Sequence, residues 1–240
     1  MTLRQSHTYI CGYTGYPIST NQGARETLTP VREHGGVTQD SSARKSALRS
    51  QLRAARKQRD PGAMAKLDSQ ISQQISDVLE TIELTHGSVI AAYVAMPHEP
   101  SMNTLRSQLN DMGCTVLIPV VSGDQLLWAL DGDEASWARN TFGTLEPDPL
   151  GARTSSQALP TCTAIIVPSQ AIDPRGFRLG QGKGFYDRAL AEVADLEHSP
   201  MIIGVTFESE FLSEIPIEDH DIPVDVSVTE STVRWFSTPD

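Results

Sequence analysis

The stretch "TAIIVPSQAIDPRGFRLGQGKGFYDRAL", residues 163–190, passes from a short apolar run through a glycine-rich loop into a helical pattern. The run TAIIVP is continuously apolar, which is typical of a strand buried on both faces of a parallel sheet. In open α/β sheets, ligands bind beyond the carboxyl ends of such strands. The loop that follows has four glycines, at which backbone amides could approach a ligand closely: Gly176, Gly180, Gly182 and Gly184. We therefore predict a ligand site at the end of this strand.

The charges of the same loop favour a phosphate ligand. Arg178 and Lys183 supply cations, and the amides of the following helix add the positive end of its dipole. The GxGxG spacing fits neither a Walker loop nor a dinucleotide fingerprint. Gly176 has two equally good explanations, a tight strand-to-helix turn and contact with the ligand. Asp187 lies in the first helical turn, where either a favourable dipole interaction or a magnesium contact would explain it.

Apolar runs and helical patterns alternate along the rest of the chain. Further strands are expected at residues 88–95, 114–121, 124–130, 201–207, 226–230 and 232–236. Helices are expected over 41–59, from Pro61 to Gly87, before Gly113 and over 184–193. This alternation predicts a single α/β domain at 41–240, with helices on both faces of a mostly parallel sheet in three layers. Residues 1–40 are predicted to be a disordered or poorly packed leader.

Composition narrows the classes of function. The net charge of −11 argues against general binding to nucleic acid or anionic membranes, although residues 44–59 hold seven basic residues and no acidic one. The three cysteines lie far apart without a Cys/His cluster, which argues against a zinc site and for a reduced intracellular protein. We see neither a membrane-span pattern nor a secretory signal, and expect a cytoplasmic protein.

The segment GFRLGQGKGFYDRAL, residues 176–190, resembles the signature of the 5-formyltetrahydrofolate cyclo-ligase (5,10-methenyltetrahydrofolate synthetase) family. Four further segments resemble the family in the same order, at residues 45–56, 98–105, 142–147 and 217–230. The resemblance covers about residues 43–235. It implies a NagB/RpiA/CoA-transferase-like α/β fold. It also implies ATP- and Mg²⁺-dependent conversion of 5-formyltetrahydrofolate to 5,10-methenyltetrahydrofolate, ADP and phosphate, through phosphorylation of the formyl oxygen.

The resemblance also implies roles for individual residues. Those that match catalytic positions are Lys183, Arg178 and Tyr186. Those that match the ATP site are Lys45, Arg49, Arg178, Gly180, Gly182, Lys183, Gly184, Phe185, Tyr186 and Asp187. Those that match the folate site are Met96, Glu99 and Tyr186, and Asp187 matches the metal-side carboxylate. Either catalysis or loop capping would explain Glu146 and Asp221, whereas His220 is more easily explained as structural or solvated than as a general base.

Two alternatives stay open on the sequence. The irregular spacing after Glu99, where Thr104 falls two residues late, would suit a paralogue that keeps the ATP site and acts on another substrate. A non-catalytic sensor of nucleotides or sugar phosphates could use the same loop and would need no metal carboxylate. A nucleic-acid partner is disfavoured by the net charge. We expect a monomer, because no assembly motif is visible. We expect its partner to be a small molecule, a reduced folate.

Overall fold

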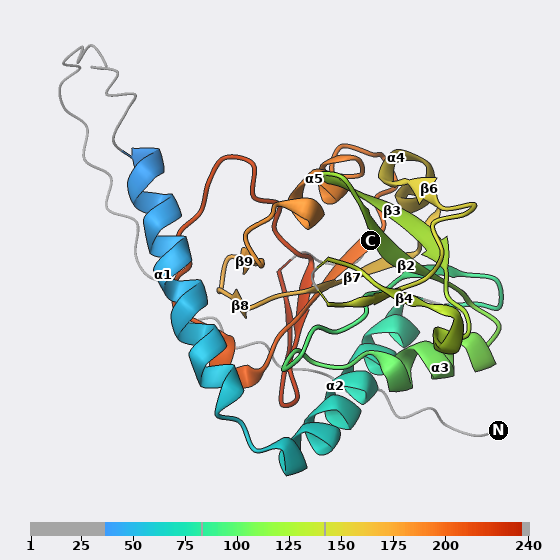
Figure 1. Ribbon diagram of the computed structural model, residues 1–240, viewed down its shortest axis with the longest axis horizontal. Helices are drawn as coiled ribbons and strands as arrows, with labels where there is room; N and C mark the ends of the chain where they lie inside the picture. Colours follow the sequence, from blue (N-terminus) through green and yellow to red (C-terminus); the bar gives the residue numbers. More distant parts are fainter. Residues whose placement is uncertain (1–36, 83, 142, 237–240) are drawn as a thin grey trace, which may run out of the picture. The chain divides into compact units, whose positions relative to one another are not determined.

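The computed structural model describes residues 37–82, 84–141 and 143–236, and the side chains from Ser41 onward (Figure 1). These residues fall within one compact unit. The expected leader, residues 1–40, lies outside the described residues except for its last four, which belong to helix α1 (Val37–Lys57). That helix therefore begins four residues before the expected start at Ser41.

An eight-stranded sheet forms the centre of the structure, in the order β12-β11-β10-β7-β1-β2-β3-β6. The five strands from β11 to β2 run parallel, and β12, β3 and β6 add antiparallel edges. The strand bounds are β1 (Val89–Ala91), β2 (Thr115–Ser122), β3 (Gln125–Leu130), β6 (Arg153–Thr154), β7 (Ala164–Pro168), β10 (Met201–Val205), β11 (Val226–Val228) and β12 (Val233–Trp235). The predicted mostly parallel sheet is thus confirmed, and the TAIIVP run forms β7 from its second residue onward, between β1 and β10.

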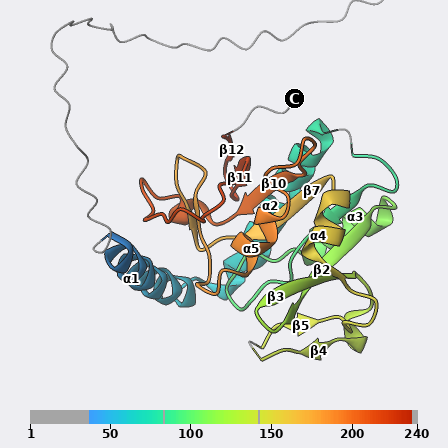
Figure 2. The same ribbon diagram turned by 90° about the horizontal axis from the view of Figure 1, so that it is seen from above.

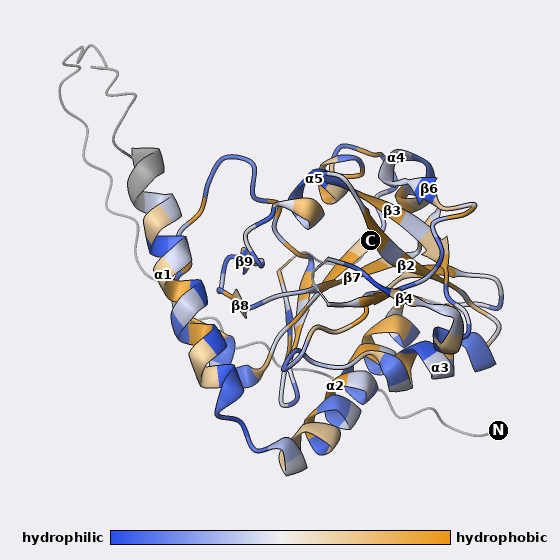
Figure 3. Cartoon of the chain, viewed as in Figure 1, coloured by the Kyte–Doolittle hydropathy of each residue, from blue (hydrophilic) through white to orange (hydrophobic). Residues whose placement is uncertain are grey.

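Alternate residues of β7 pack into two different hydrophobic cores, as the two-residue period of a strand requires. Ala164 and Ile166 join a core with helices α2 (Pro61–Thr81) and α3 (Asn103–Asp111). Ile165 and Val167 join a second core, with α4 (Ser155–Ala158) and α5 (Phe185–Ala191). The helices therefore cover both faces, and the predicted three layers are confirmed: in Figure 1, α4 and α5 lie above the sheet and α2 and α3 below it. Figure 2 shows the same structure from above. Apolar residues concentrate in the strands and on the inner sides of α2 and α3 (Figure 3).

Helix α1 packs away from these two cores. Its Leu52 and Leu48 contact a third, small cluster that includes residues of the hairpin β8 (Ala171–Ile172) and β9 (Arg178–Leu179). Figure 1 shows α1 alongside this hairpin. Because the hairpin leads directly into the glycine-rich loop, this packing sets the basic residues of α1 beside that loop.

Several short elements were not expected from the sequence. They are β4 (Ala138–Arg139), β5 (Leu145–Glu146), β6, the β8–β9 hairpin, α4, and the 3₁₀ turns η1 (Glu134–Ser136), η2 (Leu159–Thr161) and η3 (Glu208–Glu210). The second helix ends at Thr81, before the expected stop at Gly87, but begins as predicted with Asp60 as its cap and Pro61 at its first position. Among the described helices, none combines the length and apolarity needed to cross a membrane.

Candidate functional site

A cavity of about 580 Å³ opens beside the ends of β1 and β7. Four segments that are distant in sequence contribute most of its charged lining: helix α1, the turn after β1, the glycine-rich loop into α5, and the loop at 218–221. The residues expected at the ATP and folate sites that line it are Lys45, Arg49, Met96, Glu99, Arg178, Gly180, Gly182, Lys183, Gly184, Phe185, Tyr186 and Asp187. The structure therefore brings together at one cavity every site residue that the resemblance implied.

The glycines of the loop have different structural reasons. Gly182 has φ +98°, and a Cβ there would lie 3.2 Å from the guanidinium carbon of Arg49. Gly184, with φ +66°, precedes the first residue of α5. Gly176 also has a positive φ, but a Cβ there would lie 2.8 Å from the carbonyl oxygen of Val224, away from the cavity lining. Of the two explanations for Gly176, the tight turn is thus favoured over ligand contact.

Two cations of α1 reach the cavity from one helical face. Lys45 is buried, and its Nζ lies 2.8 Å from Glu218 Oε2 and 2.6 Å from Asp221 Oδ2. Arg49 donates from Nε to the carbonyl oxygen of Gly180 at 2.9 Å. Burial, followed by the charge of Arg53, lowers the pKa of Arg49. The helix therefore holds the glycine-rich loop on one side and the 218–221 loop on the other.

Arg178 and Asp187 form an ion pair inside the cavity lining. Arg178 is buried and donates from Nη2 to Asp187 Oδ1 at 2.7 Å. Its Nε is also buried and has no hydrogen-bond partner among the described residues. Asp187 is therefore a counterion in this arrangement, in addition to lying in the first turn of α5. The ion pair therefore holds the buried guanidinium of Arg178 beside the cavity.

Two aromatic residues follow the loop. The ring of Tyr186 meets Trp128 edge to face at a centroid distance of 6.5 Å. Burial raises the pKa of Tyr186 well above its ordinary value, so its hydroxyl is neutral and can donate a hydrogen bond. Phe185 packs against the second core, with the guanidinium of Arg188 5.4 Å from its ring centroid. Phe185 therefore both packs on the second core and lines the cavity.

The carboxylate of Glu99 is buried beside the cavity. Its turn is closed by a hydrogen bond of 3.0 Å from Glu99 N to Met96 O, and His98 within it has φ +70°. One carboxylate oxygen accepts from Met96 N at 3.0 Å, and the other accepts from Gln181 Nε2 at 2.5 Å. Burial raises the pKa of Glu99, while these hydrogen bonds and the charge of Arg56 partly oppose the rise. Glu99 is therefore not an ordinary exposed loop glutamate.

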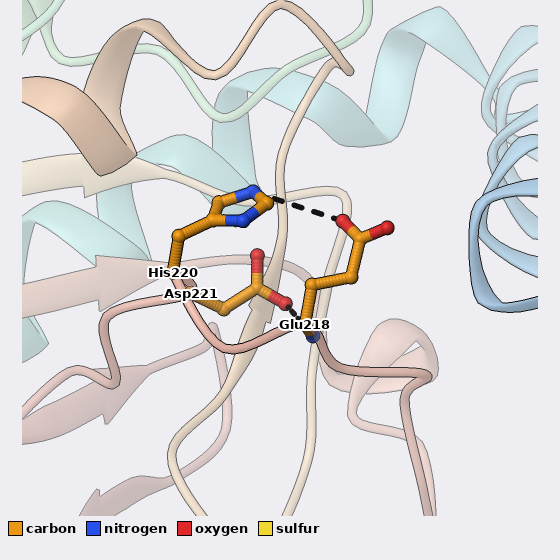
Figure 4. Close-up of side chains that lie close together, drawn as sticks. All are labelled: Glu218, His220 and Asp221. Carbon is orange, nitrogen blue, oxygen red and sulfur yellow. Dashed lines mark hydrogen bonds and ion pairs between the residues drawn. The ribbon is translucent and has the colours of Figure 1, made fainter. Parts of the chain in front are cut away.

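Glu218, His220 and Asp221 form a group of potential metal ligands (Figure 4). One ligand atom from each lies within 4.8 Å of the others. The backbone N of Glu218 donates to Asp221 Oδ2 at 2.8 Å, so Asp221 also caps its own loop. His220 Nε2 lies 3.7 Å from Glu218 Oε2, and the ring is largely exposed. Oxygen-rich sites of this kind suit Mg²⁺, and Asp187 lines the same cavity.

Glu146 caps a loop and also lines the cavity. Its Oε1 accepts hydrogen bonds from Val121 N at 3.0 Å and from Asn140 Nδ2 at 2.6 Å. Charged or polar residues at the cavity that were not predicted from the sequence include Arg53, Gln181 and Glu218. Gln181 could have been noticed inside the glycine-rich signature. For Glu218 the sequence gives no local sign that it would pair with a lysine 173 residues away.

Comparison with known proteins places this geometry in context. A model of the 5-formyltetrahydrofolate cyclo-ligase family matches residues 41–230. A 5-formyltetrahydrofolate cyclo-ligase of Mycolicibacterium smegmatis is 36% identical over 143 residues, which are 57% of this chain and 70% of that protein. One from Escherichia coli K12 is 30% identical over 150 residues, covering 61% and 80%. The solved structure of a 5,10-methenyltetrahydrofolate synthetase from Aquifex aeolicus superposes with a TM-score of 0.67 at 26% identity, covering 82% of this chain and 94% of that one.

Proposed function

The chain belongs to the 5-formyltetrahydrofolate cyclo-ligase family, and we propose that it uses ATP and Mg²⁺ to cyclise 5-formyltetrahydrofolate to 5,10-methenyltetrahydrofolate, with release of ADP and phosphate. One observation carries the proposal. A single cavity is lined both by the cationic glycine-rich loop and by the buried carboxylate of Glu99. We take the loop as the phosphate side and Glu99 as the folate side.

The chemistry explains why the two sides must meet. A formamide oxygen is a poor leaving group at neutral pH. Transfer of the γ-phosphoryl group to this oxygen would form an iminium phosphate and release ADP. The neighbouring folate nitrogen would then attack the activated carbon and lose its proton, and phosphate would leave with the former formyl oxygen and take up that proton. Such phosphoryl transfer depends chiefly on positioning and on neutralising charge.

The phosphate side is supplied by cations and bare backbone. Lys45, Arg49 and Lys183 would bind phosphate oxygens, and the glycines would let backbone amides come close. Arg178 lines this side as a buried cation and would offset charge on the transferred group. Its position is fixed by Asp187, so the cation would be oriented before the substrate arrives.

The folate side is supplied by Glu99, Met96 and Tyr186. An ionised Glu99 would accept hydrogen bonds from the N–H groups of a reduced pterin, because a carboxylate has acceptor sites beyond the two already in use. Met96 would add apolar contact. Tyr186 stays protonated, so it would donate a hydrogen bond and would not act as a base.

The residues present fit a magnesium ion. Asp187 offers a carboxylate on one side of the cavity. Glu218 and Asp221 offer two more, of which Lys45 Nζ would have to release Oε2 and Oδ2 to a metal. Bound Mg²⁺ would neutralise phosphate charge, as it does in other phosphoryl-transfer sites. A cytoplasmic monomer, expected from the sequence, stays part of the proposal.

The test is turnover of 5-formyltetrahydrofolate, followed through the near-UV absorbance of the methenyl product, with and without ATP and with and without Mg²⁺. Lys183→Ala removes an exposed cation from the loop, so its effect on the fold should be small. We expect product only when both ATP and metal are present, and a rate at least tenfold lower in the variant, the loss of about one charge-assisted contact.

The matched control is Lys66→Ala, which removes an exposed lysine of α2 that does not line the cavity. It should turn over like the wild type. If the wild type forms no product but ATP still raises its melting temperature, the phosphate site stands and the substrate assignment is wrong. The family-like paralogue with another substrate would then be the better reading.

A further inference from the structure

A chain of two glutamines connects the glycine-rich loop to Glu99. Gln170, directly after Ser169 at the end of β7, is buried and donates from Nε2 to Gln181 Oε1. Gln181 in turn donates from Nε2 to Glu99 Oε1 at 2.5 Å. Gln181 and Glu99 both line the cavity, and they lie 82 residues apart in sequence. The contact therefore joins the proposed phosphate side directly to the proposed folate side.

The orientation of the Gln181 amide is fixed by its neighbours. Arg53 Nη2 lies 3.2 Å from Gln181 Oε1, and an arginine can only donate. On the other side, an ionised Glu99 can only accept. The carbonyl oxygen of the amide must therefore face Arg53 and Gln170, and its NH₂ group must face Glu99. The arrangement holds one carboxylate oxygen in place while Met96 N holds the other.

Gln170 is not expected to stabilise the fold. Its Oε1 is buried and has no hydrogen-bond partner among the described residues. A buried unsatisfied acceptor destabilises a fold, so an apolar side chain of similar length should fit this position at least as well. Within the part of the chain that the structure describes, its side chain makes one hydrogen bond, the one that orients Gln181.

We propose that Gln181 is a positioning residue that aims the Glu99 carboxylate at the folate, and that Gln170 acts through it. The proposal rests on the proposed function. It assigns to Gln181, inside the glycine-rich signature, a role in folate recognition that its neighbours in the phosphate loop do not have. The backbone carbonyl of Gln181, which accepts from Arg53 at 3.0 Å, is left intact when only the side chain is replaced.

The first measurement is steady-state kinetics of Gln181→Met. The KM for 5-formyltetrahydrofolate should rise about tenfold, as expected for a misdirected hydrogen bond to a charged group, while the KM for ATP stays within about twofold of the wild type. Gln73→Met is the matched control, because Gln73 also donates to a carboxylate, that of Asp77, but on the exposed side of α2. It should change neither KM. Equal rises in both constants for Gln181→Met would overturn the proposal.

Gln170→Met separates positioning from a structural role. A structural residue loses stability when it is replaced; here the unfolding free energy in urea should be unchanged or higher, because an unsatisfied acceptor is removed. The folate KM should nevertheless rise. The double variant Gln170→Met/Gln181→Met should match Gln181→Met alone, since the two residues act in series. Additive effects, or a loss of stability without a change in KM, would contradict the assignment.

A measurement without substrate keeps this inference separate from the proposed reaction. The carboxyl carbon of Glu99, assigned by its loss in Glu99→Gln, can be titrated by ¹³C NMR. Gln181 helps to keep the carboxyl ionised, so Gln181→Met should move this titration to higher pH. The other charged or titratable groups around the carboxylate remain in place: Arg56, Glu210, Tyr93 and Tyr186. If the titration does not move, the positioning role is overturned, even if the enzyme turns over 5-formyltetrahydrofolate. If the titration moves, the role is supported, even if the wild type does not turn over this substrate.

Discussion

Arg178 donates a hydrogen bond of 2.7 Å to Asp187, and the arginine is almost fully buried. Removing the carboxylate would leave a buried cation without its counterion. We expect Asp187→Ala to lower the free energy of unfolding by about 3 kcal/mol, the lower end for breaking a buried ion pair. Asp187→Asn keeps an acceptor and should lose less. Both variants should lose turnover, because the proposed metal-side carboxylate is gone.

Urea denaturation and the formylfolate assay check this prediction together. The control is Asp195→Ala, at an exposed position just beyond α5, where neither property should change. A stable Asp187→Ala protein would mean that Asp187 is not the counterion of Arg178. A fully active Asp187→Asn protein would instead count against its metal role and would favour the dipole explanation for this residue.

Lys45 occupies the position of a cation between Glu218 and Asp221, at 2.8 and 2.6 Å. Lys45→Met removes that charge and leaves the two carboxylates unneutralised. We expect nucleotide affinity to fall about tenfold or more, while the affinity for Mn²⁺ alone rises because the ammonium no longer competes for the same oxygens. Calorimetric titration with each ligand measures both effects.

Arg44→Met is the control for this prediction, because Arg44 is the exposed basic neighbour of Lys45 on the same helix. Arg44→Met also removes one positive charge, but Arg44 does not line the cavity. If Arg44→Met weakened nucleotide binding as much as Lys45→Met, the effect would come from the general field of α1 and not from the contact between Lys45 and the 218–221 loop.

Gly182 combines backbone strain with close packing. Any side chain there would adopt φ +98° and place Cβ 3.2 Å from the guanidinium of Arg49. Gly151 has a similar φ, +79°, but nothing within 4 Å of its Cβ position. Alanine at either site should destabilise the fold by about 1–2 kcal/mol through strain. Only Gly182→Ala should also weaken ATP binding, measured by thermal shift. Equal ATP affinity in both variants would rule out a contact role for Gly182.

Strands β2, β7 and β10 were predictable because each is an apolar run within the parallel part of the sheet, which buries both of its faces. The β8–β9 hairpin was not, because its two strands have only two residues each and the segment between them reads as a loop. That loop is held by Asp173, which is fully buried and accepts from Arg175 and from the backbone N of Ile215, 42 residues away. A contact between residues so far apart in the sequence leaves no periodic signal.

In the candidate site too, features that are local in sequence could be predicted and contacts between distant residues could not. The glycine-rich loop and the Lys45–Arg49 pair could be located because their residues are close in sequence and match a family signature. The partners could not, since nothing near Lys45 indicates Glu218, and nothing near Glu99 indicates Gln181. These pairings form only when the sheet brings α1, the turn after β1 and the 218–221 loop to one edge. Recognition of the family thus supplied the residues, and the fold supplied their contacts.

Glu99 gives the fold a defined response to pH. Burial raises its pKa above the ordinary value of 4.5, so ionising it disfavours the folded state. As pH rises from 4.5 through the raised pKa, the wild type should lose stability that Glu99→Gln does not lose. The unfolding free energy of Glu99→Gln minus that of the wild type should therefore increase with pH in this window. Urea denaturation at a series of pH values measures the difference.

Glu208 provides a control of opposite sign. Its pKa is lowered, chiefly by its hydrogen bond from Arg234. The stability that this carboxylate contributes is present above 4.5 and is lost as pH falls through the lowered pKa. The unfolding free energy of Glu208→Gln minus that of the wild type should therefore stay level above pH 4.5 and increase as pH falls below it. The corresponding difference for Glu99→Gln increases as pH rises above 4.5. A Glu99 difference that fell with increasing pH would mean that the carboxylate is stabilised in its ionised form, and that burial is not the dominant influence on it.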